Sequence, residues 1–195
     1  MRTTDDQRHR RGQATVEFSL VLMAFLTVIV AIAEFAFFLT IKINVTDASQ
    51  DAVQTAAEMG NSPDADFSIL QVVETDMGAP ADKSKILSVE VIWTNSYGTA
   101  NYGENRYTRT GTLWNSAATA SVPFAQNGGS SYPYSQRCSI VSGVGCYSGH
   151  ATVDWVAVKI TYQYAWVTPL PGMIGLSGAA PTFVQISICR LEPIQ

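Results

Sequence analysis

The chain has 195 residues, with 12 Lys and Arg against 16 Asp and Glu, and charged residues make up only 14% of it. Because 47% of the residues are hydrophobic, the composition excludes a disordered chain, which combines high charge with low hydrophobicity. The net charge of −4 argues against a general nucleic-acid-binding protein, whose clustered cations must neutralise phosphates.

The first 41 residues have the composition of a membrane anchor. Residues 1–12 form a basic leader of net charge +2, which leaves −6 for the rest of the chain. Between Phe18 and Ile41, 20 of 24 residues are hydrophobic, and the single charged residue is Glu34. A helix of this stretch is about 36 Å long and crosses a hydrocarbon core of about 30 Å. We therefore predict a transmembrane helix over residues 13–41.

The leader also predicts the orientation of that helix. Cations directly before a first span stay in the cytoplasm, so the acidic remainder of the chain lies on the far side of the membrane. A cleaved secretory signal is the competing interpretation. The length of the apolar run weakens it, as does the lack of a small-residue cleavage site followed by polar chain.

The junction between leader and span carries the most informative pattern. Gly12 ends the leader, and Glu17 and the aromatic Phe18 follow after four residues. A carboxylate at the edge of a membrane span is costly without a partner. Cleavage between Gly12 and Gln13 would create an α-amine one helical turn from Glu17, or beside the Glu17 of a neighbouring subunit, and the two charges would neutralise each other. The alternative is an interfacial Glu in an unprocessed single-pass protein.

These residues resemble the class III signal peptides of the type IV pilin superfamily, most closely those of the TadE-like minor pilins (pseudopilins) of tight-adherence (Tad, type IVc) pili. In that family a cleaved Gly is followed by four residues, a Glu and an aromatic residue, as from Gly12 to Phe18. The aromatic residue is more often Tyr, so Phe18 is a mild departure. A second Glu late in the span, matched by Glu34, precedes an Ala-rich amphipathic extension. The resemblance covers residues 8–60 well and the last forty residues loosely.

The resemblance implies a set of partners and a location. A membrane aspartyl prepilin peptidase would cut between Gly12 and Gln13, and the other partners would be pilin subunits, the pilus assembly machinery and membrane lipid. It implies the bacterial inner membrane, with the globular domain outside the cytoplasm or in an extracellular pilus. For Glu34 two roles stay open: an unpaired or snorkelling side chain, and an ion pair or hydrogen bond between subunits in a bundle.

Beyond the span, the pattern predicts an α+β fold. Apolar residues recur every three to four positions, so the helix continues as an amphipathic extension over residues 42–60, in one helix from Ala14 to Met59 that ends at Gly60. Residues 61–195 form a globular domain outside the cytoplasm. We expect Ser62 to cap a short helix there, followed by alternating strands at residues 86–93, 156–164 and 183–191. Their antiparallel sheet should pack its apolar face on the extension.

Residues 94–150 form an excursion rich in Gly, Ser, Tyr and Asn with little periodicity. It contains either short strands of its own or an exposed functional loop. Aromatic residues of the kind that line polar binding surfaces occur in it at Tyr97, Tyr102, Tyr107, Trp114, Tyr132 and Tyr134. A contact with a receptor, a carbohydrate or a partner pilin is one interpretation, and a surface coil is the other.

Three cysteines lie in the exported part of the chain. Cys138 and Cys146 bracket a short Gly/Ser-rich loop, and we favour a disulfide between them, which would add roughly 2–3 kcal/mol of stability. Cys189 is then either a free, buried thiol or an alternative partner for one of the other two.

The sequence supports neither catalysis nor a cofactor. Its two histidines, His9 and His150, lie far apart in the chain, and no nucleophile motif or metal-ligand spacing accompanies them. We predict a processed minor pilin that acts in pilus assembly, surface adhesion or secretion. The alternative is an unprocessed, signal-anchored cell-surface binding protein. An anchored enzyme is a third class, for which we find no residue set.

Overall fold

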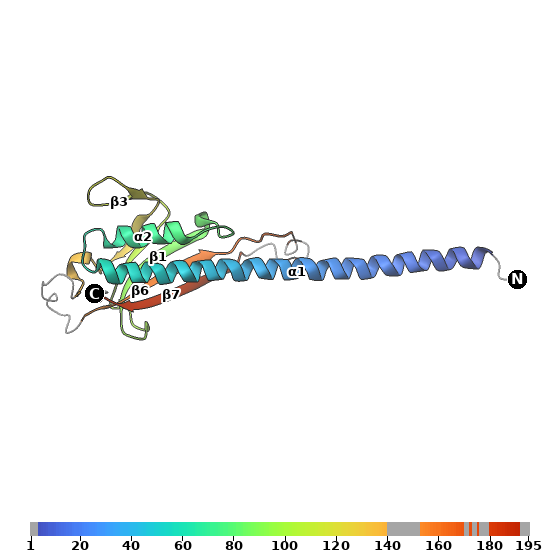
Figure 1. Ribbon diagram of the computed structural model, residues 1–195, viewed down its shortest axis with the longest axis horizontal. Coiled ribbons are helices and arrows are strands. Elements are labelled where there is room, and N and C mark those ends of the chain that lie inside the picture. The colour runs from blue at the N-terminus through green and yellow to red at the C-terminus, as the bar shows by residue number, and fades with distance from the viewer. Residues whose placement is uncertain (1–3, 140–152, 170–171, 173–174, 176–179, 192–195) are drawn as a thin grey trace. The chain divides into compact units, whose positions relative to one another are not determined.

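The computed structural model describes residues 4–139, 153–169, 172, 175 and 180–191, with the backbone alone for residues 4–12. It divides into a helix unit, Met1–Leu39 with Trp166–Ala179, and a sheet unit, Thr40–Ala165 with Ala180–Gln195. The elements in chain order are the helices α1 (Thr4–Met59) and α2 (Ala65–Asp76), the 3₁₀ helix η1 (Lys83–Lys85), the strands β1 (Ile86–Thr94), β2 (Gly103–Thr108), β3 (Leu113–Trp114), β4 (Ser121–Val122) and β5 (Ala125–Ser130), the 3₁₀ helix η2 (Tyr134–Gln136), and the strands β6 (Trp155–Gln163) and β7 (Thr182–Arg190) (Figure 1). The predicted α+β class is confirmed.

Helix α1 is longer at its start than the sequence predicted. It begins at Thr4, ten residues before the expected Ala14, because the polar leader contains no proline and its Arg and Gln residues are good helix formers. Its end agrees with the prediction. Gly60 follows Met59 with a φ of +53°, and its N–H donates to the Ala56 carbonyl at 3.1 Å. A left-handed residue of this kind closes the helix, and glycine adopts it without a steric penalty.

The sheet unit is built on five antiparallel strands in the order β5-β2-β1-β6-β7. The three predicted strands correspond to β1, β6 and β7, with Val91 opposite Val158 and Val158 opposite Ser187. The excursion supplies the rest of the sheet, since β2 pairs with β1 and β5 pairs with β2. It also forms a separate two-stranded sheet, β3-β4. Its described part is therefore integrated into the fold rather than coiled over the surface.

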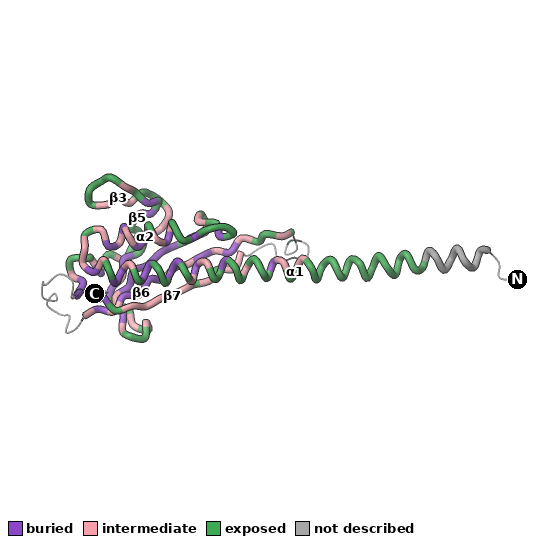
Figure 2. Tube along the Cα trace, in the orientation of Figure 1, coloured by how far each residue is buried: buried purple, intermediate pink, exposed green. Residues whose placement is uncertain are grey.

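The amphipathic part of α1 packs against β6 and β7, as predicted. The Ser49 hydroxyl lies 2.7 Å from the Ser187 hydroxyl and 3.3 Å from the Val158 carbonyl. The α1 residues buried in the sheet unit recur at helical spacing and are Ile41, Val45, Ala48, Ser49, Ala52, Val53, Ala56 and Ala57. Figure 2 shows that burial changes along α1, with buried positions in the part of the helix that belongs to the sheet unit. Small side chains allow the helix backbone to approach the sheet closely.

Helix α2 covers the β2 half of the same sheet face, but it does not begin where the sequence predicted. The expected cap was Ser62, whereas the helix starts at Ala65 with Asp64 in the capping position. Asp64 makes no side-chain cap bond and instead accepts hydrogen bonds from Ser116. A tertiary contact thus takes the side chain that local rules would assign to the helix end.

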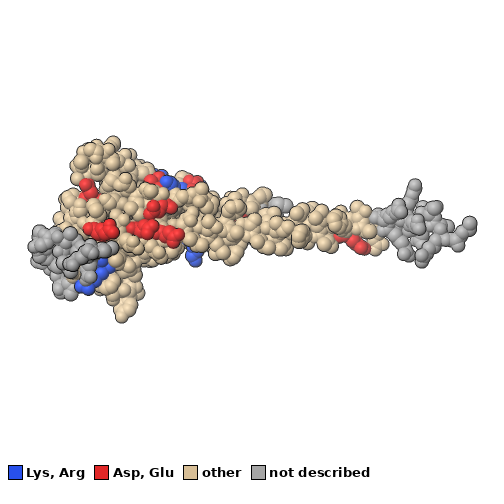
Figure 3. All heavy atoms as spheres, in the orientation of Figure 1, with Lys and Arg blue, Asp and Glu red and all other residues tan. Residues whose placement is uncertain are grey.

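The two exposed surfaces of the sheet unit differ in charge pattern. On the sheet face away from α1, Glu90 lies 2.7 Å from the Lys159 ammonium and 3.6 Å from the Arg106 guanidinium, a cross-strand group over three neighbouring strands. Acidic side chains gather on the helical side (Figure 3). There, burial and the charge of nearby Asp51 raise the pKa of Asp76. The helical side of the unit is therefore an acidic surface.

The close approach of α1 to the sheet gives the first prediction. Ala52 is fully buried in that contact, so Ala52→Leu forces extra methylenes into a filled space and should destabilise the sheet unit by about 1–3 kcal/mol. The measurement is the thermal midpoint of the full-length protein in detergent, followed by circular dichroism of the strands. Gln54→Leu, at an exposed position of the same helix, is the matched control. Equal midpoints for the two variants would contradict the packing described here.

Candidate functional site

The predicted cleavage junction lies inside α1. Gly12 and Gln13 are both helical, so the backbone continues from the leader into the apolar segment without a break. The Gln13 side-chain amide donates to Glu17 Oε1 at 2.9 Å. Positions 13 and 17 therefore already share one helix face, one turn apart, which is the spacing that a Gln13 α-amine would need to reach the Glu17 carboxylate.

The segment that follows the junction presents its apolar side chains outward. Gln13–Met59 contains a stretch that is long and apolar enough to cross a membrane, and only 6% of that stretch is buried within the chain. No second such helix occurs in the described residues. The exposed side chains include Phe18, Val21, Met23 and Phe25. Since the core helix of a soluble protein would be mostly buried, these side chains need an apolar environment that the part of the chain described by the structure does not supply.

Glu34 is the exception within this apolar segment, because its carboxylate is covered. It is 5% exposed and accepts hydrogen bonds from two consecutive backbone N–H groups, Val167 at 3.1 Å and Thr168 at 2.7 Å. All three residues belong to the helix unit. A carboxylate among apolar residues is costly without such donors. Two amides of the β6–β7 connection therefore provide hydrogen bonds for the Glu34 carboxylate. Sequence analysis left open an unpaired side chain and a contact between subunits. The contact between subunits remains a prediction.

The cysteines are partly outside the described residues. Cys138 is buried, and its N–H donates to Asp154 at 2.9 Å. Cys189 is a free, half-buried thiol on β7. Cys146 and His150 lie outside the described residues, so the Cys138–Cys146 disulfide remains a prediction.

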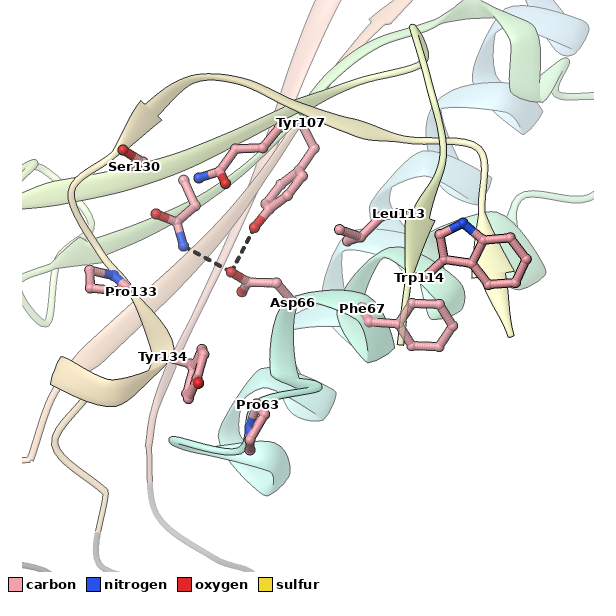
Figure 4. A pocket seen from close by; sticks show the side chains of 11 residues that line it. Pro63, Asp66, Phe67, Tyr107, Leu113, Trp114, Ser130, Pro133 and Tyr134 are labelled. Carbon is pink, nitrogen blue, oxygen red and sulfur yellow. Dashed lines mark hydrogen bonds between the residues drawn. The ribbon is translucent and has the colours of Figure 1, made fainter. Parts of the chain in front are cut away.

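A second feature, in the sheet unit, was missed by sequence analysis. Asp66, on α2, accepts hydrogen bonds from Asn105 and from the Tyr107 hydroxyl, both at 2.8 Å, and forms an ion pair with Arg137 at 2.6 Å. Burial and the Asp66 charge raise the pKa of Tyr107, so its hydroxyl stays protonated as a donor. This network forms the floor of a pocket of about 330 Å³ (Figure 4).

The aromatic residues of the excursion gave a partial signal for this pocket. Trp114 and Tyr134 line it and are 56% and 42% exposed. Tyr107 and Tyr132 are buried: the Tyr107 hydroxyl belongs to the pocket floor, whereas Tyr132 does not line the pocket and donates to Asp154 at 3.0 Å. The enrichment in aromatic residues does not distinguish buried core positions from exposed contact positions, because Tyr and Trp occur in both. Asp66 gave no signal, since its partners lie 39 to 71 positions away.

Comparison with known protein families finds a match in the N-terminal part of the chain. Residues 12–54 match the model of the TadE-like protein family. The resemblance predicted from the sequence is therefore confirmed over a range that includes Gly12, Gln13, Glu17 and Glu34. Searches of curated proteins and of solved structures found no match.

We call residues 12–54 the TadE-like segment, and its similarity to that family is consistent with a TadE-like pilin of the Tad pilus system. Together with its apolar helix, it indicates a membrane-anchored protein. The segment ends within α1, so it includes neither the sheet nor the pocket. No group of three or more potential metal ligands is assembled among the residues that the structure describes.

The covered carboxylate of the TadE-like segment yields a second prediction. Glu34→Leu removes both acceptors, so the amides of Val167 and Thr168 should exchange with solvent about tenfold faster or more, since each hydrogen bond to a charged group contributes about 1.5–3 kcal/mol. Hydrogen exchange of the full-length protein in detergent, read on the peptide that spans both amides, measures this. Glu34→Gln keeps one acceptor oxygen and should give an intermediate rate.

Thr27→Val is the matched control within the same helix. The Thr27 hydroxyl donates to the Met23 carbonyl of its own helix, so this variant should leave exchange at the two amides unchanged. If the two amides of the Glu34→Leu protein exchange at the wild-type rate, the Glu34 carboxylate does not protect the β6–β7 connection.

Proposed function

We propose that this protein is a minor pilin of a Tad-type (type IVc) pilus, processed by a prepilin peptidase and then assembled with other pilin subunits. The observation that carries the proposal is the exposed apolar segment of α1, which coincides with the TadE-like match. A helix of this kind is stable in lipid before assembly and in a bundle of like helices afterwards. Both environments cover the same side chains, so the subunit can move from one to the other.

Processing would change the charge at the end of this segment. The leader, residues 1–12, carries the arginines that hold the unprocessed N-terminus in the cytoplasm. Cleavage after Gly12 removes that excess positive charge and leaves one α-amine at Gln13. The contact between Gln13 and Glu17 at 2.9 Å supports their pairing. With both charges neutralised, the end of the helix can enter an apolar bundle.

The proposed location follows from the same charges. The protein would sit in the bacterial inner membrane with its N-terminus in the cytoplasm, and the acidic sheet unit would lie outside, free in the envelope or displayed on a pilus. Its partners would be the peptidase, other pilins, the assembly machinery and lipid. The competing function is an unprocessed, signal-anchored surface protein, which would keep its leader.

Processing at Gly12 is the first test. Gly12→Leu should leave most of the protein uncleaved, because a bulky side chain at the scissile bond blocks access to the peptide carbonyl. Intact mass and N-terminal sequencing of protein from cells that carry a Tad prepilin peptidase measure this. Ala24→Leu, which also introduces a leucine but inside the apolar segment, should be cleaved like the wild type.

A wild-type protein that still begins at Met1 would exclude the processed pilin and favour the surface protein. The same mass, measured without reduction, also reports whether Cys138 and Cys146 are bonded.

Charge pairing at Glu17 is a separate test. Glu17→Gln preserves the shape of the side chain but leaves the Gln13 α-amine uncompensated, and an unpaired charge in apolar surroundings costs about 3–5 kcal/mol. We expect normal cleavage and a roughly tenfold or greater loss of incorporation, measured as the fraction of protein in sheared pili relative to membranes. Glu58→Gln, at an exposed carboxylate near the far end of α1, should incorporate normally. Equal incorporation of the two variants would exclude this role for Glu17.

A further inference from the structure

The pocket of the sheet unit combines aromatic walls with polar groups. Its volume is about 330 Å³, near the lower end of the usual range for small-molecule sites, about 300–1,000 Å³. Figure 4 shows Trp114 and Tyr134 on opposite sides of Asp66, with Phe67 beside the indole. Gln126 and Ser130 also line it. A pocket of this size accepts one small ring system rather than an extended polymer.

The Trp114 side of the pocket is fixed from two directions. Ser116, just after β3, donates its N–H and its hydroxyl to the Asp64 carboxylate at 2.6 and 2.8 Å. Arg109, before β3, forms an ion pair with Glu74 on α2 and lies over the Phe124 ring at 5.2 Å. The segment that carries Trp114 is therefore bonded on one side to Asp64, directly before α2, and on the other to Glu74 of α2. Trp114 itself is 56% exposed.

The polar side of the pocket coincides with an irregularity in the sheet. In the β2–β5 pair, Asn105 lies opposite Ser130 but Tyr107 lies opposite Gln126, so β5 carries extra residues between the two pairs. Bulges of this kind redirect side chains and occur next to binding sites. Here Gln126 and Ser130, at the two ends of the irregularity, both line the pocket.

The charge of the pocket floor is already compensated. The Asp66 carboxylate accepts hydrogen bonds from Asn105 and Tyr107 and is paired with Arg137, whose side chain is 1% exposed. A cationic ligand would have to compete with this buried guanidinium. An anionic ligand would meet the negative field of an acidic unit. The floor therefore favours a neutral ligand.

The groups that remain available are neutral as well. The Trp114 indole N–H and the hydroxyls of Ser130 and Tyr134 have no hydrogen-bond partner among the described residues. Gln126 uses its amide N–H on Gly129, which leaves its carbonyl oxygen as an acceptor. The pocket thus offers flat aromatic surfaces together with neutral donors and acceptors at their edges.

We infer that this pocket binds a neutral saccharide, with one pyranose ring held between the Trp114 and Tyr134 sides. A pyranose presents C–H groups on its faces and hydroxyls around its edge. The C–H faces match rigid aromatic side chains that lose little conformational entropy on binding. The hydroxyls match the donors and acceptors of Ser130, Gln126 and Tyr134. This inference does not depend on processing or assembly of the protein.

Saturation-transfer NMR on the full-length protein, in a detergent without a sugar headgroup, tests the inference. The probes are glucose, galactose, mannose, N-acetylglucosamine and N-acetylgalactosamine, with glucosamine and glucuronate as charged counterparts. At least one neutral sugar should bind saturably and more tightly than either charged sugar. Trp114→Ala should weaken that binding at least tenfold, and Ser130→Ala should weaken it severalfold.

Tyr97→Ala is the matched control, because Tyr97 is an aromatic residue of the same excursion that is 80% exposed and does not line the pocket. Its affinity should stay within twofold of the wild type. Both tested side chains are exposed, so their removal should leave the fold intact, as thermal midpoints will verify. Three outcomes would each overturn the inference: no saturable binding of any neutral sugar, tighter binding of a charged counterpart, or undiminished binding by a folded Trp114→Ala protein.

Discussion

The contact between the alanine-rich face of α1 and strands β6 and β7 is the interaction on which the sheet unit depends. Ala48 and Ala52 are fully buried there, and the Ser49 hydroxyl reaches β7 at 2.7 Å. A sheet with one apolar face needs a cover, and here the same helix that supplies the cover also carries the TadE-like segment. Small side chains allow the close packing, whereas the large side chains Phe18 and Phe25 remain exposed among the described residues.

Carboxylates in this protein are satisfied by different kinds of partner according to their surroundings. Glu34, among apolar residues, accepts two backbone amides. Asp66, in the sheet unit, combines two neutral donors with a guanidinium. Glu17, on an exposed helix face, contacts a neutral amide and gains a cationic partner only if cleavage exposes the Gln13 amine. For the buried Glu34, the cost of an unpaired charge in apolar surroundings explains the need for such partners.

Periodic patterns made the fold predictable. The end of α1 at Gly60 and the strands β1, β6 and β7 follow from local chemistry and side-chain alternation, which a short window of sequence contains. The strands β2 and β5 were not predictable in the same way. β2 contains the polar residues Glu104 and Asn105, and β5 contains Gly128 and Gly129, so neither has an apolar alternation. β2 pairs along one edge of β1, and β5 in turn pairs along the outer edge of β2. Pairing partners far apart in sequence are not visible in a local pattern. The same limit applies to Asp64, which a distant Ser116 draws away from capping α2.

The sequence by itself determined the apolar segment, the charge asymmetry around it and the spacing of Gly12, Gln13 and Glu17, because these properties depend on residue order along one helix. Only the tertiary structure decided which residues cover Glu34, which aromatic residues are core and which are surface, and where the pocket lies. These depend on contacts between positions up to about 130 residues apart, such as Glu34 with Val167. Such contacts arise when strands pair and helices pack, and no short stretch of the chain encodes them alone.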